Sequence, residues 1–69
     1  MKKPTNEQIL NIIRKNHPDP EVMGVCEDLL SVTNVLDVTL GDVKDASGFD
    51  RELARDVSKA LLRAIKEAC

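Results

Sequence analysis

Apolar residues recur at the three- and four-residue spacing of helices in several segments of this chain. The first segment carries an apolar stripe made of Ile9, Leu10, Ile12 and Ile13. Thr5 followed by Gln8 predicts a capping box at the start of this helix. Residues 16–20 include two prolines and predict its end, because proline disfavours helical backbone at its own position and at the preceding one.

A second helix is predicted to follow at once. Asp19 is a favourable N-cap and Pro20 suits the first helical position. The helix is expected to fade near residues 31–34, and its apolar face comprises Val22, Met23, Cys26, Leu29 and Leu30. Gly24 costs this helix about 1 kcal/mol relative to alanine, and a glycine also permits close helix packing. Residues 35–38 are too short for an independent strand, and we expect an extended connector there.

Two more helices are predicted in the second half. Thr39 followed by Asp42 indicates a cap for a short helix over residues 40–47, and Gly48 is a natural stop. Asp50 caps a longer helix that continues to the C-terminus without glycine or proline. Its apolar face comprises Leu53, Ala54, Val57, Leu61, Ala64, Ile65 and Ala68.

These elements predict an all-α fold, a compact bundle of about four helices in a single domain over residues 1–69. A chain this short buries only about 60% of its unfolded surface. The expected core consists of Ile9, Ile13, Val22, Cys26, Leu29, Phe49, Val57, Leu61 and Ile65. The stripe of small residues on the last helix suits either this core or the interface of a homodimer.

The segment 39–61 resembles a helix-turn-helix motif. Val43 occupies the inward apolar position of the first helix, and the turn 48–50 reads as a glycine, the apolar anchor Phe49 and a polar cap. The resemblance implies a corner between the last two helices, with the final helix in the DNA major groove. Lys44 departs from the pattern, since the motif favours a small residue at that position.

Charge is segregated along the chain, although the net charge is only −2. Residues 1–18 carry four bases and one acid, a net charge of +3. Residues 19–50 carry eight acids and one base, a net charge of −7. Residues 51–69 carry five bases and three acids, a net charge of +2. Such an acidic middle can steer a basic partner, or it serves solubility alone.

The leading functional hypothesis is a small non-enzymatic protein-binding module, a regulator, inhibitor or adaptor of bacterial or phage type. Its candidate contact residues are Asp42, Asp45 and Asp50, and its partner is expected to have a basic surface. The alternative is a helix-turn-helix DNA-binding transcriptional regulator that uses the basic face of the last helix, with Arg51, Arg55, Lys59 and Arg63. The acids near that face oppose phosphate contact, and a merely solvated charged face is the bland interpretation of both surfaces.

The sequence predicts no catalytic or cofactor site. His17 lies alone in a turn, and the serines and carboxylates form no catalytic motif. This histidine and two distant cysteines, Cys26 and Cys69, do not supply the three or four ligands of a metal site. Apolar runs are far shorter than the roughly 20 residues of a membrane span. No apolar segment follows the first lysines as in a signal peptide, so a cytoplasmic location with no membrane partner is expected.

Overall fold

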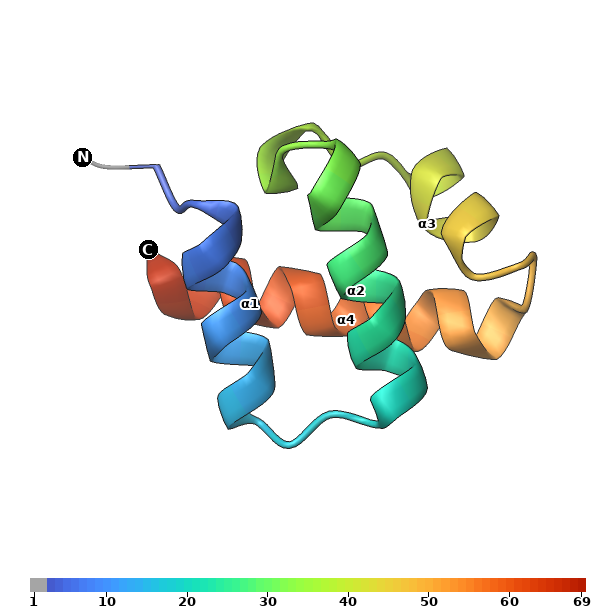
Figure 1. The fold of residues 1–69 in the computed structure, drawn as a ribbon, viewed down its shortest axis with the longest axis horizontal. Helices are drawn as coiled ribbons and strands as arrows, with labels where there is room; N and C mark the ends of the chain where they lie inside the picture. The colour runs from blue at the N-terminus through green and yellow to red at the C-terminus, as the bar shows by residue number, and fades with distance from the viewer. Residues whose placement is uncertain (1–2) are drawn as a thin grey trace.

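The computed structural model describes residues 3–69 and confirms the all-α bundle (Figure 1). Lys2, which the sequence places in the basic N-terminal segment, lies outside the described residues. The described chain contains one short 3-10 helix, η1 (Val35–Asp37). It also contains four α-helices: α1 (Asn6–Lys15), α2 (Pro20–Val32), α3 (Leu40–Ala46) and α4 (Arg51–Ala68).

Each α-helix begins at the polar cap that the sequence predicts. Thr5 and Gln8 form a reciprocal capping box, in which the Gln8 N–H donates to Thr5 Oγ1 at 3.1 Å. Thr39 and Asp42 form the same arrangement at the start of α3. The carboxylate of Asp50 accepts a hydrogen bond from the Leu53 N–H at 3.1 Å. These bonds satisfy backbone donors that a helix start leaves without partners.

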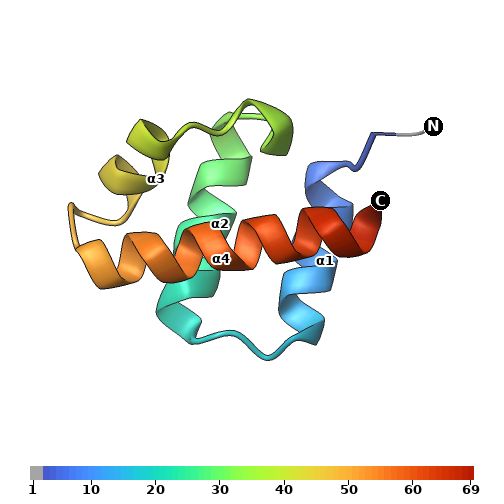
Figure 2. The same ribbon diagram turned by 180° about the vertical axis from the view of Figure 1, so that it is seen from behind.

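Helices α1 and α2 lie side by side and antiparallel, and α4 crosses both of them (Figures 1 and 2). Helix α3 packs beside the first half of α4 and also contacts α2. The core lies where α1 and α2 meet α4, and Ile9, Cys26 and Val57 are completely buried there. None of the helices in residues 3–69 combines the length and apolar character needed to cross a membrane.

The predicted core is right at seven positions: Ile9, Ile13, Val22, Cys26, Leu29, Val57 and Leu61. Ile65 is partly buried against this core. Phe49 was expected inside and is instead 76% exposed, because the turn after α3 directs its ring out of the bundle. Gly24 was expected to permit close packing, yet a Cβ built at this position would meet no atom within 4 Å.

The connector over residues 35–38 is not extended, because its first three residues form the 3-10 turn η1. Asn34 causes this turn, since its side-chain oxygen accepts a hydrogen bond from the Leu36 N–H and its carbonyl accepts one from the Asp37 N–H. An asparagine that precedes a turn and bonds to the backbone two residues on is a known local signal. The sequence-based prediction of an extended connector followed the alternation of apolar residues in this segment and did not use the signal from Asn34.

Asn6 ties the start of α1 to the end of α2. Its amide nitrogen donates to the carbonyls of Leu30 and Thr33, both at 2.9 Å. Its amide oxygen accepts from the Val35 N–H at 2.8 Å. One partly buried side chain therefore satisfies three backbone groups at the end of α2 and the start of η1. These hydrogen bonds fix the position of the start of α1 relative to the end of α2.

Candidate functional site

The turn that joins α3 to α4 is a Schellman motif. The Gly48 N–H donates to the Asp45 carbonyl at 3.1 Å, and the Phe49 N–H donates to the Lys44 carbonyl at 2.9 Å. Gly48 and Phe49 both adopt a backbone φ of 63°. Glycine takes this left-handed conformation freely, whereas a bulky residue with a Cβ pays about 1–2 kcal/mol for it.

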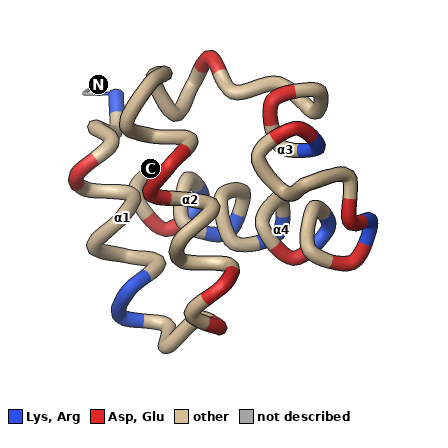
Figure 3. Tube along the Cα trace, turned by 45° about the vertical axis from the view of Figure 1, so that its right-hand side comes forward, with Lys and Arg blue, Asp and Glu red and all other residues tan. Residues whose placement is uncertain are grey.

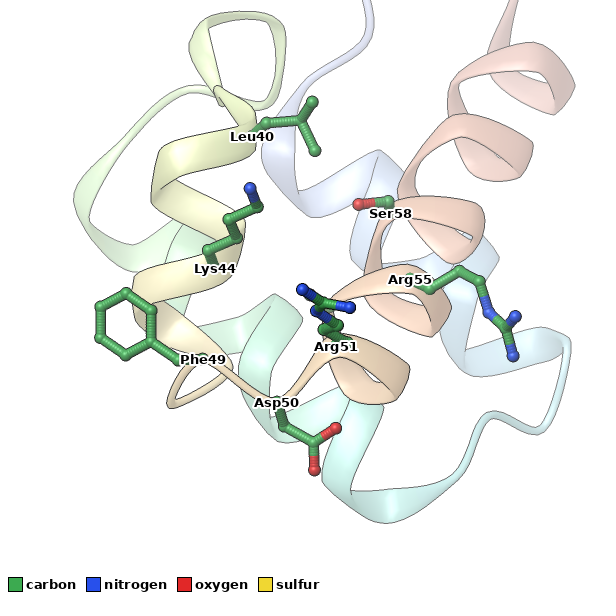
Figure 4. A pocket seen from close by; sticks show the side chains of 8 residues that line it. Leu40, Lys44, Phe49, Asp50, Arg51, Arg55 and Ser58 are labelled. Atoms are coloured by element: carbon green, nitrogen blue, oxygen red, sulfur yellow. The ribbon is translucent and has the colours of Figure 1, made fainter.

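Beside this turn lies a hollow of about 510 Å³ between α3 and the first two turns of α4. Leu40 and Lys44 come from α3, and Ser58 comes from α4. Figure 4 shows these three side chains directed into the space between the helices, with Phe49 and Arg55 projecting outward at its edges. Leu40 therefore gives the hollow an apolar side, and Phe49 lies at its edge with its ring directed outward.

A second hollow, of about 260 Å³, continues along α4 from the first, and Leu40 and Ser58 line both. It is lined mainly by apolar side chains, including Val38, Leu62 and Ile65. We call the two hollows together the α3–α4 groove. Three large apolar side chains along it are mostly exposed: Leu40 at 69%, Phe49 at 76% and Leu62 at 65%.

Cations edge one end of the α3–α4 groove. Lys44, Arg51 and Arg55 line the hollow nearest Phe49. The one acid there, Asp50, already accepts the capping hydrogen bond of α4. Within residues 3–69 the only ion pair joins Arg14 to Glu27, at 3.8 Å, on a different part of the surface. The charge of the three groove cations is therefore available to a ligand.

The three aspartates proposed for protein binding do not share one surface. Asp42 and Asp45 line a shallow hollow between α2 and α3 together with Asp28, whereas Asp50 lines the α3–α4 groove. The carboxylate of Asp42 accepts a hydrogen bond from the Thr39 N–H at the start of α3. Two of the three proposed residues, Asp42 and Asp50, thus act as helix caps. Figure 3 shows acidic and basic positions close together on α3 and around the turn that follows it.

The four basic residues proposed for DNA binding are also divided, although all four are exposed. Arg51 and Arg55 line the α3–α4 groove. Lys59 and Arg63 line a different hollow, of about 270 Å³, near the loop between α1 and α2. This 270 Å³ hollow also includes Asp19 and Asp56, so its charge is balanced.

The thiols of the chain differ in accessibility. Cys69 is exposed at the end of α4, whereas Cys26 is buried in the core. Burial, with a smaller contribution from the charge of Glu27, raises the pKa of the Cys26 thiol to about 11. The thiolate is the reactive form of cysteine, so Cys26 is expected to be inert in the folded protein.

Sequence reasoning missed the groove, although one of its residues carried a signal. At 100° per residue, Leu62 falls on the basic face of α4, between Arg51 and Arg55, and not on its apolar face. Leu40 and Phe49 gave no comparable sign, because their exposure depends on how α3 is oriented. Comparisons of the chain with protein-family models, curated proteins and solved structures find no match.

Proposed function

We propose that this protein is a small non-enzymatic binding module that docks a protein partner in the α3–α4 groove. The supporting observation is the gathering of exposed Leu40, Phe49 and Leu62 along one hollowed face. Single exposed apolar side chains are ordinary, whereas contiguous ones with polar borders are typical of interaction sites. A module of this kind acts as a regulator, inhibitor or adaptor.

The backbone conformation of Phe49 gives a further argument. Phe49 is the single aromatic residue of the chain, and it is exposed in a backbone conformation that disfavours it. Glycine or asparagine would close the same turn with less strain. Aromatic side chains are enriched among the residues that dominate the energy of protein interfaces, so a binding role gives a reason for phenylalanine at this position.

The proposal is tested by selecting a displayed library of helical peptides on the immobilised protein. Selected peptides should bind the wild type and lose about tenfold or more in affinity for the double variant Leu40→Ser with Phe49→Ser, because an apolar contact carries about 1–3 kcal/mol. Val32→Ser is the matched control, since Val32 is an apolar residue that is even more exposed and does not line the groove. It lines the hollow between α2 and α3 that contains Asp28, Asp42 and Asp45, called here the acidic hollow.

Circular dichroism of each variant checks that its helix content equals that of the wild type. Selected peptides that bind the double variant as tightly as the wild type would place the contact elsewhere on the molecule. A library that yields no ligand at all would count against the binding module itself.

A DNA-binding regulator is the second candidate, favoured by the exposed arginines that follow the α3–α4 turn. It requires that labelled duplex DNA bind with an affinity that falls steeply with salt, as fluorescence anisotropy would measure. Replacement of both Arg51 and Arg55 by alanine should then remove binding, and Arg14→Ala on α1 should not. Full DNA affinity after the double replacement would exclude this surface, and no binding at low salt would exclude the function.

A further inference from the structure

The α3–α4 groove is apolar along its length but charged at one end only. Lys44, Arg51 and Arg55 line the end next to Phe49. The residues that line the other hollow, towards Ile65, include no charged side chain. A ligand that fits the whole groove must therefore bring an apolar stripe, with negative charge at one of its ends.

The shape of the groove favours a helical ligand. Along α4 it extends from Arg51 to Ile65, which is about 21 Å at 1.5 Å per residue, the length of a helix of about 14 residues. A peptide that binds by adding a strand would need a sheet edge, and residues 3–69 form no strand. A helix satisfies its own backbone hydrogen bonds and needs only side-chain contacts from the groove.

We propose that the α3–α4 groove binds an acidic amphipathic helix of a partner protein. The apolar face of that helix packs on Leu40 and Leu62, and its carboxylates lie opposite the groove cations at the Phe49 end. This inference rests on the proposed protein-binding function and adds the chemistry of the partner. It also differs from the sequence-based expectation, which paired the acids of this chain with a basic partner.

Charge argues against two other occupants. A second copy docked parallel through the same groove would place Lys44, Arg51 and Arg55 against identical cations, and one docked antiparallel would place them against an uncharged apolar end, so neither arrangement gives them an opposite charge. Nucleic acid would meet cations at the Phe49 end but no charged side chain in the other hollow, where its phosphates would find no cation. An acidic amphipathic helix complements both ends.

Fluorescence anisotropy with three labelled helical peptides of about 14 residues tests the inference. All three carry the same leucine stripe, and three positions near one end are glutamate, glutamine or lysine. The glutamate peptide should bind about tenfold or more tighter than the lysine peptide, with the glutamine peptide between them, and added salt should reduce the difference.

Charge-reversal variants test whether the groove cations cause the preference for the glutamate peptide. Lys44→Glu combined with Arg51→Glu should invert the preference, so that the lysine peptide becomes the tighter ligand. The matched control is Lys59→Glu with Arg63→Glu, which reverses two charges on α4 outside the groove and should change the ratio of affinities by less than about twofold.

The outcomes separate the two proposals. Equal affinity for the glutamate and lysine peptides would overturn the acidic partner and leave the binding module intact. Failure of all three peptides to bind, together with failure of the displayed library, would overturn both. Duplex DNA that binds at Lys44 and Arg51 while no peptide binds would assign the groove to nucleic acid and overturn the acidic helix.

Discussion

At the scale of single residues, Phe49 combines two unfavourable features, a left-handed backbone and an exposed ring. Hydrophobicity alone predicts burial for phenylalanine, and this rule failed because the Schellman turn fixes the direction of the side chain. A residue that is unfavourable for folding and also exposed at a groove is a reasonable candidate for function. Stability and binding should therefore respond in opposite directions when glycine replaces it.

Phe49→Gly should raise the free energy of unfolding by about 1 kcal/mol, because glycine adopts this φ without strain. The same variant should weaken binding of the glutamate peptide about tenfold. Urea denaturation measures the first effect and anisotropy the second. Gly48→Ala, at the same φ, is the control and should lower stability by a similar amount. A less stable Phe49→Gly protein would show that the ring contributes to folding.

Ser47 is buried, and its Oγ has no hydrogen-bond partner among the described residues. An unpaired buried hydroxyl costs about 1–3 kcal/mol of desolvation. Ser47→Ala is therefore expected to raise the free energy of unfolding by about 1 kcal/mol in a urea titration. A loss of stability would reveal that the hydroxyl does find a partner in solution.

The buried thiol of Cys26 should make stability fall at alkaline pH. Burial raises its pKa from 9.0 to about 11, so above pH 9 the unfolded chain releases a proton that the folded protein retains. The contribution is complete below pH 9 and is lost as the pH rises to about 11. Urea denaturation between pH 8 and pH 11 measures this loss, and Cys26→Ala should reduce the slope relative to wild type. Equal slopes would contradict the assignment.

At the scale of elements, the helix boundaries follow from interactions within three or four residues. Thr5, Asp19, Thr39 and Asp50 are each close in sequence to the N–H groups that they cap, so the sequence predicts all four helix starts. The 3-10 turn at residues 35–37 was missed, although Asn34 carried a local signal for it. Packing between elements is harder to predict from the sequence, because it depends on partners that are distant in the chain.

Asn6 is the clearest case of such a distant interaction, since its three partners lie 24–29 residues away. Asn6→Ala should lower the free energy of unfolding by about 3 kcal/mol, because it leaves three backbone groups without their partner. Asn11→Ala, on the exposed side of α1, should change it by less than about 0.5 kcal/mol. Chemical denaturation of the two variants side by side checks the difference, and equal values would mean that water replaces Asn6.

At the scale of the whole molecule, α3 separates two surfaces of different character. Towards α2 lies the acidic hollow with Asp28, Asp42 and Asp45, and towards α4 lies the groove with its basic end. The sequence predicts the total charge of each segment but not this division, which depends on the orientation of α3. The groove itself was also beyond prediction, because η1, α3 and α4 all contribute to its lining.

The most direct measurement is a map of backbone amide chemical shifts in the protein as the glutamate peptide is added. We expect the largest changes on the groove, at Leu40, Lys44, Phe49, Arg51 and Leu62, and no change in the acidic hollow. Changes centred on Asp28 and Asp45, or on Lys59 and Arg63, would contradict the assignment of the α3–α4 groove as the binding surface. So would a spectrum that does not change at millimolar peptide.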